Sequence, residues 1–262
     1  MEPVQTIACN ICGEKRDFEE VYVDRPGNLR VVRCRGCGLV FVNPTFTPRE
    51  HLEYYNTLYW DFPTDAAGSY REIPPERIQR WEKRARAHID YFATFCDPIK
   101  HGSRLHGLEV GCGYAAHLAE VKRRCPEARL AAVEPNRRLY NVIRERLPDV
   151  QILGNTLERL SGVRMLFDCI IAVDVLQRTI DPTYTCRRMH TMLAPDGLCL
   201  IIVNNLAGRQ GHVYGLSRLH YFTEGTLHPL LTKCHLDIVR LDVRGEFGLA
   251  GDDCIYAIVK KK

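Results

Sequence analysis

Four cysteines near the start of the chain have the spacing of a metal site. They form two Cys-x-x-Cys pairs, Cys9/Cys12 and Cys34/Cys37, and a glycine follows each second cysteine. Two pairs at this separation are typical of a tetrahedral zinc site made of four thiolates, and glycine allows the tight turns around the sulfur atoms. A redox pair, a disulfide framework and four unrelated cysteines are the alternatives. Neither pair lies at a strand-to-helix turn as a thioredoxin-like motif would, so we expect structural Zn²⁺.

The composition is that of a globular chain. Its 262 residues are 45% hydrophobic and 26% charged, which is enough for one full core and a small appendage. No apolar run of signal-peptide length follows Met1, and the longest apolar run, Leu198–Val203, is far below the ~20 residues of a membrane span. We therefore expect a cytoplasmic protein with no membrane partner, in which disulfides would be rare. The net charge of +4 is spread along the chain, so a nucleic-acid partner is neither indicated nor excluded by charge.

A glycine turn in the middle of the chain is the second feature that could do chemistry. In "LEVGCGYAAHL", Gly111 and Gly113 let backbone amides approach a ligand closely. Read with Ala116, the turn fits a dinucleotide fingerprint, and Glu134 falls about 20 residues on, where a ribose-binding acid belongs. An NAD-dependent oxidoreductase is therefore an alternative. Against it stands Glu109, a carboxylate inside a strand that would normally bury an apolar side chain, and which suits a cationic ligand.

Alternating strands and helices must position this turn. We predict strands at Leu105–Val110, Arg129–Glu134, Val150–Leu153, Phe167–Val173 and Leu198–Val203, with helices beginning near Tyr114, Asn136, Pro182 and Thr226. Two more strands, His235–Arg244 and Asp253–Lys260, should pair antiparallel at one edge. The pattern predicts an α/β fold, a Rossmann-like, mostly parallel seven-stranded sheet with helices on both faces, plus the small N-terminal zinc ribbon. Ligands should bind at the carboxyl ends of the strands.

An aromatic connector joins the cysteines to the sheet. It is interrupted by Pro63 and Gly68, and a helix with one apolar face follows from Ile78 to Cys96. A connector of this kind could close over the site as a lid, with Tyr54, Trp60 and their neighbours packing on the ligands; plain packing between domains is the alternative.

These stretches resemble the class I S-adenosylmethionine-dependent methyltransferases, specifically the group with an N-terminal zinc ribbon. "CRGCGLVFVNP" and "YYNTLYW" resemble the ribbon and connector of that group, and "LEVGCGYA" resembles its glycine motif, with Ala115 where a third glycine usually stands. "AAVEPN", "FDCIIAVDVLQRTIDP", "MLAPDGLCLIIVNN" and "RLHYFTEGTL" resemble its later motifs in the right order. The resemblance implies a zinc ribbon over residues 1–45, the connector and amphipathic helix over 46–100, and an S-adenosylmethionine-binding domain over 101–262. It implies methyl transfer to a small molecule.

The resemblance also implies which residues hold the cofactor. They are Glu109, Gly111, Gly113, Glu134, Asn155, Thr156 and Asp174. Glu134 would accept hydrogen bonds from both ribose hydroxyls, and Glu109 would favour the cation. Asn155 and Thr156 match the segment that borders adenine, although ordinary turn formers look the same. Asp174 would lie over the reacting centre and orient the substrate or the cofactor ammonium; a helix N-cap is the alternative.

The substrate side departs from the family pattern. Many relatives have Glu-His where this chain has Gln177 and Arg178, and a histidine where it has Arg218. Arginine cannot act as a base at neutral pH but holds carboxylates and phosphates well. We therefore expect an acidic substrate, such as a sugar phosphate, a nucleotide-linked sugar or a carboxylated metabolite, bound by these arginines with Tyr55 and Tyr59. Two solvated surface arginines are the alternative.

A general base is expected in the late segment of the chain. His220 is the first choice, Tyr221, His212 and Tyr214 are the other candidates, and Asp174 is expected to be catalytic as well. A histidine beside aromatic residues is also typical of a packed core. A second alternative function is a zinc-ribbon protein that modifies or binds nucleic acid through the basic stretch "RWEKRARAH".

Overall fold

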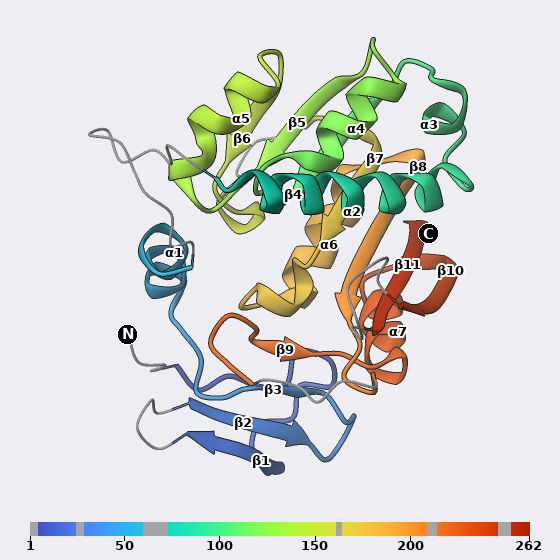
Figure 1. The fold of residues 1–262 in the computed structure, drawn as a ribbon. Coiled ribbons are helices and arrows are strands. Elements are labelled where there is room, and N and C mark those ends of the chain that lie inside the picture. Colours follow the sequence, from blue (N-terminus) through green and yellow to red (C-terminus); the bar gives the residue numbers. More distant parts are fainter. Residues whose placement is uncertain (1–4, 25–28, 60–72, 161–163, 209–213, 246–252) are drawn as a thin grey trace.

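The computed structural model of the chain contains two β-sheets that are linked by a helical connector (Figure 1). It describes residues 5–24, 29–59, 73–160, 164–208, 214–245 and 253–262. Trp60, Pro63, Gly68 and His212 lie outside these residues. In the part of the chain that is described, no helix combines the length and the apolar character that crossing a bilayer requires.

The larger sheet has the seven strands that the sequence predicts. In spatial order they are β10 (Leu236–Gly245), β11 (Asp253–Lys261), β8 (Leu193–Asn204), β7 (Phe167–Val173), β4 (His106–Val110), β5 (Arg129–Val133) and β6 (Gln151–Gly154). The pairs among β4, β5, β6, β7 and β8 are parallel, whereas β11 runs antiparallel to both β8 and β10. The predicted antiparallel pair at one edge is confirmed. The fifth strand begins at Leu193 rather than Leu198, because Leu193 already pairs with Phe167 of β7. The register then shifts before Leu198 pairs with Cys169.

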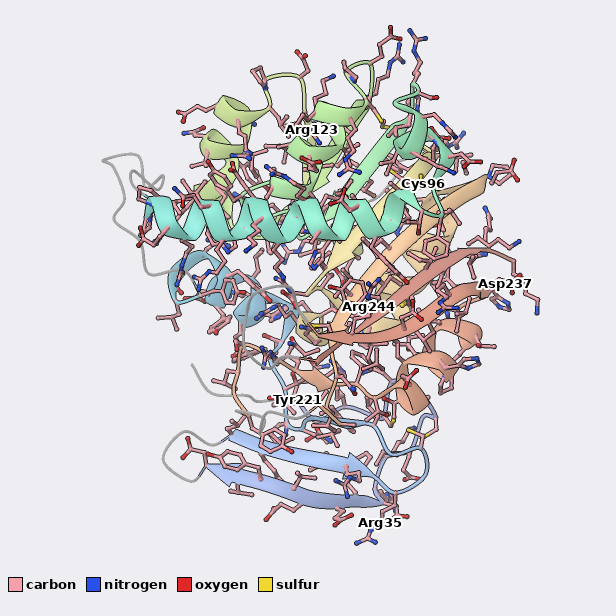
Figure 2. The ribbon with its side chains drawn as sticks, turned by 45° about the vertical axis from the view of Figure 1, so that its right-hand side comes forward. Arg35, Cys96, Arg123, Tyr221, Asp237 and Arg244 are labelled. Carbon is pink, nitrogen blue, oxygen red and sulfur yellow. The ribbon has the colours of Figure 1, made fainter. Side chains whose placement is uncertain are left out.

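Helices cover both faces of this sheet, as predicted. One face carries α2 (Pro75–Ala93), α3 (Asp97–His101), α4 (Ala116–Arg124) and α5 (Tyr140–Arg146), and the other carries α6 (Pro182–Met192) and α7 (Glu224–Lys233). The predicted amphipathic helix is α2, which buries Ile89 and Phe92 against α4 and runs across that face (Figures 1 and 2). The apolar side chains of the strands therefore pack into two separate cores, one on each side of the sheet.

The smaller sheet combines the two ends of the sequence. β1 (Phe18–Asp24), β2 (Leu29–Cys34) and β3 (Val40–Val42) form an antiparallel meander near the cysteines, and β9 (His220–Tyr221) adds to its edge through Val40 and Phe41. Phe41 is fully buried in the same core as Leu227 of α7. The smaller sheet thus packs in the same core as one face of the larger sheet.

The connector contains a helix that the sequence analysis did not predict. Helix α1 (Pro48–Thr57) begins at a capping box in which Thr47 and Glu50 bond each other's backbone N–H groups. Its other end lies against the larger sheet, because the Asn56 side chain donates to the Pro135 carbonyl at 3.1 Å and accepts from the Arg137 amide at 3.1 Å. The connector thereby reaches the carboxyl ends of the strands.

Candidate active site

A cavity of about 520 Å³ lies at the carboxyl ends of β4, β5, β6 and β7. This size is ordinary for a small-molecule site, and it lies where an open α/β sheet binds its ligands. One part of its wall comes from the strand ends, including Gly111, Glu134, Asn155 and Asp174. The opposite part comes from α1 and α2. Two elements that are separate in sequence therefore enclose one space.

The glycine turn after β4 forms the floor of this cavity. Gly111 and Gly113 have φ values of +66° and +53°, and a Cβ on Gly111 would lie 2.9 Å from a methyl of Val175. Ala115, in place of a third glycine, also has a positive φ of +57°, and it immediately precedes α4. The turn therefore needs glycine for its shape and leaves room for a ligand directly above the backbone.

Glu134 directly follows β5 at the wall of the cavity. Its side chain is 3% exposed, and its two oxygens accept hydrogen bonds from the Gly113 amide at 2.7 Å and the Asn136 amide at 2.8 Å. Burial raises its pKa to about 7, and the nearby charge of Glu109 adds to this, while the two amides oppose it. The predicted acid is thus held in place, with oxygen lone pairs left for a ligand.

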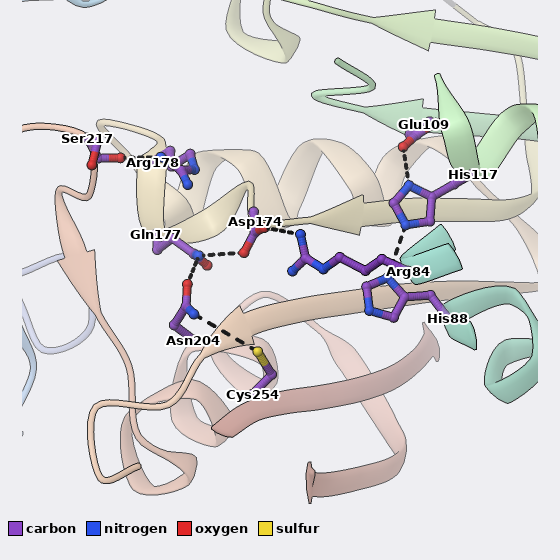
Figure 3. A network of polar contacts seen from close by, with 10 residues as sticks. All are labelled: Arg84, His88, Glu109, His117, Asp174, Gln177, Arg178, Asn204, Ser217 and Cys254. Carbon is purple, nitrogen blue, oxygen red and sulfur yellow. Dashed lines mark hydrogen bonds and ion pairs between the residues drawn. The ribbon is translucent and has the colours of Figure 1, made fainter. Parts of the chain in front are cut away.

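Glu109 is held by a pair of stacked histidines (Figure 3). Its Oε1 lies 2.7 Å from His117 Nδ1, and His117 Nε2 lies 3.0 Å from His88 Nδ1. The two rings are nearly parallel at 5.3 Å. Burial lowers the pKa of His88 well below its usual value, so this ring is neutral. The chain of contacts positions a buried carboxylate at the cavity through histidines rather than through an arginine.

Asp174 follows β7 in a left-handed conformation, with φ +60°, and accepts from two side chains (Figure 3). Arg84 of α2 donates to Oδ2 at 2.7 Å, and Gln177 donates to Oδ1 at 2.9 Å. Burial would raise the pKa of Asp174, but the charges of Arg84 and Arg178 outweigh it and hold the pKa well below its usual range. Asp174 is therefore an ionised group that anchors α2 at the cavity, rather than a free base.

The two predicted arginines have different positions. Arg178 belongs to the short helix η3 (Leu176–Arg178) and lines the cavity. Its Nη1 donates to the Ser217 carbonyl at 2.7 Å, and its guanidinium lies 5.1 Å from the centre of the Tyr59 ring. Arg218 does not line the cavity.

The connector supplies an aromatic wall. Tyr55 and Tyr59 line the cavity, as predicted for substrate-binding residues, with ring centres 4.9 Å apart. His51, one turn earlier in α1, lies edge-to-face with Tyr55 at 5.0 Å and also lines the cavity. Burial raises the pKa of both tyrosines and lowers the pKa of His51 to about 4, although the Arg178 backbone opposes this lowering. The wall thus presents neutral phenols and a neutral imidazole.

His220 and Tyr221 do not face the strand ends, contrary to expectation. His220 is 1% exposed, stacks on Phe41 and Phe222, and lies 3.0 Å from the Asn10 amide through Nε2. Burial lowers its pKa to about 3. The Tyr221 hydroxyl accepts from the Gly215 amide at 3.0 Å, and the residue lies beside the ribbon sheet (Figure 2). Both side chains are packed in the interior through strand β9, so neither His220 nor Tyr221 can act as a base in the cavity.

Asn155 and Thr156 follow β6 and line the cavity, next to the glycine turn and Glu134. The predicted cofactor residues Glu109, Gly111, Gly113, Glu134, Asn155, Thr156 and Asp174 are therefore brought together in one place.

The four N-terminal cysteines also converge. All four sulfur atoms lie within 4.8 Å of one another, and the Cys9–Cys37 and Cys12–Cys34 sulfur pairs are 3.4 Å apart. A tetrahedral Zn²⁺ with bonds of ~2.3 Å would set its sulfur ligands about 3.8 Å apart, which these positions fit with small shifts. Gly13 and Gly38, both at φ +81°, close the two turns. The cluster is thus compatible with a small structural zinc site.

The first cysteine turn is attached to the cavity-bearing half of the molecule. The Asn10 carbonyl accepts from Thr183 of α6 at 2.7 Å and from Lys233 of α7 at 3.2 Å, and Lys233 also donates to the Ile11 carbonyl at 2.7 Å. Together with His220, these contacts fasten the turn to α6, α7 and β9. A displacement of the cysteine turn would therefore also displace α6, α7 or β9, and of these α6 and β9 lie close to Arg178 in the fold.

Comparison with known proteins agrees with this geometry. Residues 108–199 match a family model described as a methyltransferase domain. The match supports a class I S-adenosylmethionine-dependent methyltransferase. It runs from within β4 to within β8, the region that carries the glycine turn, Glu134 and Asp174, and does not include the four N-terminal cysteines.

A curated relative points the same way over part of the chain. The ubiquinone biosynthesis O-methyltransferase of Parvibaculum lavamentivorans is 28% identical over 147 residues, which are 54% of this chain and 56% of that protein. The chain thus spans about half the length of this curated relative.

Solved structures show the same fold. A Burkholderia thailandensis 1,6-didemethyltoxoflavin N1-methyltransferase, solved with that compound and S-adenosylhomocysteine, aligns with a TM-score of 0.59 at 18% identity and covers 93% of this chain and 100% of its own. The N-methyltransferase NodS of Bradyrhizobium japonicum, solved with S-adenosylhomocysteine, aligns with a TM-score of 0.51 at 19% identity and covers 81% and 97%. The methyltransferase fold is therefore shared well beyond the matched domain.

The sequence analysis did not assign three of the cavity residues described above, His51, Arg84 and His117, to the site. His51 follows the Thr47–Glu50 capping box by one residue, and that motif would have placed it on a helix. Arg84 and His117 lie on the inward faces of α2 and α4, but no local pattern shows which strand end an inward polar residue will meet.

Proposed function

We propose that the chain binds S-adenosylmethionine in this cavity and transfers its methyl group to a small-molecule acceptor. The observation that carries the proposal is the buried Glu134 carboxylate, held beside a glycine turn that a side chain would block. A sulfonium compound with a ribose and an ammonium group fits this set of groups: two buried carboxylates for the cation and the hydroxyls, and bare backbone for close approach.

When bound, S-adenosylmethionine supplies an electrophilic methyl group. The chain's own residues then have three tasks. Glu134 binds the ribose, Glu109 favours the cationic end, and the connector with α2 excludes water from the cavity. Asn155 and Thr156 border the adenine in this proposal, and Asp174 orients the ligand through Arg84.

The acceptor must lose a proton, and His51 is the residue we propose for this step. The two nitrogens of His117 are engaged by Glu109 and His88, and Asp174 is bonded to Arg84 and Gln177. His51 is neutral, and its imidazole lines the cavity edge-to-face with Tyr55.

We propose further that the cysteine cluster holds one structural Zn²⁺. Four thiolates complete a tetrahedral shell, so the ion would have no open position for a substrate. Its role would be to keep the ribbon folded against α6 and α7.

The expected acceptor is an acidic small molecule, such as a sugar phosphate, a nucleotide-linked sugar or a carboxylated metabolite. Arg178 supports this expectation because it lines the cavity. The similar proteins are methyltransferases, which favours neither the NAD-dependent oxidoreductase nor the nucleic-acid protein.

Calorimetry tests the cofactor directly. S-adenosylhomocysteine should bind the purified chain, NADH should not, and Glu134→Ala should weaken binding by about 1.5–3 kcal/mol, the range for lost hydrogen bonds to a charged group. Equal affinity of the wild type and Glu134→Ala would contradict the proposed ribose site. Incubation with labelled S-adenosylmethionine and extract from the source organism would then identify the acceptor.

A further inference from the structure

Arg178 is a cation in the cavity that has no carboxylate partner among the described residues. Its contacts are one hydrogen bond, from Nη1 to the Ser217 carbonyl, and the face of the Tyr59 ring. Its Nε is buried and has no hydrogen-bond partner in the described part of the chain. A partly buried guanidinium normally has its charge paired, because leaving it unpaired costs free energy.

The carboxylate whose charge acts on Arg178 already accepts hydrogen bonds from other side chains. Asp174 influences Arg178, but its two oxygens accept from Arg84 and from Gln177. Tyr59 and Tyr55, whose pKa values are raised by burial, remain uncharged phenols. Two guanidiniums therefore face one carboxylate at this end of the cavity, and Arg218 adds positive charge to the surroundings of Tyr59.

The surroundings of Arg178 also have a definite shape. Tyr55, Tyr59 and His51 give the same end of the cavity an aromatic wall, and Ile180 and Pro48 also line the cavity. The other carboxylates that we assign to the cofactor are Glu109 on strand β4 and Glu134 directly after strand β5. The cavity thus has an acidic half at Glu109 and Glu134 that suits a cation, and a basic, aromatic half around Arg178 that suits an anion. Glu158 and Asp181 also line the cavity and accept hydrogen bonds from Thr185 and from the Tyr184 amide.

We infer that the basic half is a subsite for an oxyanion carried on a ring, and that Arg178 is its main charge partner. This inference rests on the proposed function, because it names the class of acceptor that the methyl group reaches. A carboxylate or a phosphate would accept two parallel hydrogen bonds from a guanidinium, while the ring packs on the tyrosines. His51 would lie beside the bound ring, where a hydroxyl or amino group could give up its proton.

Binding of simple probes tests the inference without knowledge of the natural acceptor. In the presence of saturating S-adenosylhomocysteine, benzoate and phenyl phosphate are titrated by NMR against the neutral isostere benzamide. We expect at least one anion to bind about tenfold or more tightly than benzamide, and the better of the two identifies the oxyanion. Equal binding of all three probes, or no binding of either anion, would overturn the subsite.

Three variants assign the effect to Arg178. Arg178→Gln should weaken binding of the preferred anion about tenfold, Arg178→Lys should restore part of it, and Arg218→Gln should change it no more than about threefold. Thermal unfolding identifies any variant that has lost its fold, and the lysine variant then decides the result. Unchanged anion affinity in a folded Arg178→Gln protein would refute the inference. Affinity for S-adenosylhomocysteine is measured in parallel, and its absence in the wild type would refute the proposed cofactor while leaving the anion titrations readable.

Discussion

Glu134 has a pKa near 7, so binding of the cofactor should depend on pH in the physiological range. The pKa is raised mainly by burial, and ribose hydroxyls donate to the ionised form. Ligand affinity should therefore be full above the pKa and fall as the pH drops through it. Between pH 8 and pH 6 the ionised fraction falls about tenfold.

We predict a drop of about tenfold in the affinity for S-adenosylhomocysteine over the same interval, measured by calorimetry at pH 8, 7 and 6. Glu134→Gln is the matched control, because it cannot ionise, and its weaker affinity should be nearly flat with pH. A steep pH dependence that persists in Glu134→Gln would assign the effect to another group.

His51 should remain neutral through the whole working range. Burial lowers its pKa to about 4, so the imidazole should titrate only below about pH 5. Nitrogen-15 NMR of the histidine rings, assigned with His51→Gln, should show a neutral ring with one protonated nitrogen between pH 6 and pH 8. A midpoint near 6.5 would mean that His51 is exposed to water and that the connector does not cover the cavity.

Residue types and spacing picked out residues that the structure brings together around one cavity, including Glu134 and Arg178, but they did not place His220. The four cysteines, Glu134 and the glycines belong to short local motifs. Such motifs can be recognised from neighbouring residues alone, without knowledge of the tertiary structure. His220 could not be assigned in this way. Its role depends on which side of a two-residue strand faces Phe41, and that pairing joins distant parts of the sequence.

At the level of elements, we expect α1 to respond to ligands because it forms one wall of the cavity. It lines the cavity with Tyr55 and Tyr59, and Asn56 ties its end to the loop after β5. We predict that adding S-adenosylhomocysteine slows amide hydrogen exchange between Leu52 and Tyr59, measured by mass spectrometry.

Asn56→Ala is the control for this prediction. It removes both hydrogen bonds to the loop, so exchange in α1 should be faster without ligand and the protection gained with ligand should shrink. Slow exchange in the wild type that does not change on adding ligand would show that α1 is a fixed wall rather than a lid.

The strands of the large sheet were predicted well because each is a short apolar run between clear turn residues. Helix α1 was missed although Thr47, Pro48 and Glu50 form an N-terminal signature, because the aromatic residues that follow are unusual in an exposed helix. Strand β9 could not have been predicted, since a pair as short as His220–Tyr221 has no periodicity of its own.

At the scale of the whole molecule, loss of the metal should affect ligand binding in the two halves of the cavity differently. We predict that the purified protein carries one zinc per chain, and that Cys37→Ser loses it and about 3 kcal/mol or more of stability, which is roughly 6–10 °C in the melting temperature. Metal analysis and thermal unfolding measure both changes.

Binding measurements on the same variant show how far the loss is transmitted. Because the first cysteine turn is fastened to α6, α7 and β9, anion binding at Arg178 should weaken, whereas binding of S-adenosylhomocysteine at the strand ends should change little. Cys125→Ser, a buried cysteine outside the cluster, should keep its zinc. A zinc-free Cys37→Ser protein with normal stability would contradict the structural role.

The contact between Asn10 and His220 spans 210 residues of sequence, and this has a consequence for synthesis on the ribosome. At 5–20 residues per second, roughly 10–40 s separate the appearance of the two residues. During that interval the edge of β3 and the apolar face of Phe41 have no partner. The newly made N-terminal sheet could then pair with other chains and aggregate, or be bound by chaperones. Early capture of zinc by the two cysteine pairs would hold the unfinished sheet together until β9 arrives. Supply of the metal would then set the yield of folded protein during translation.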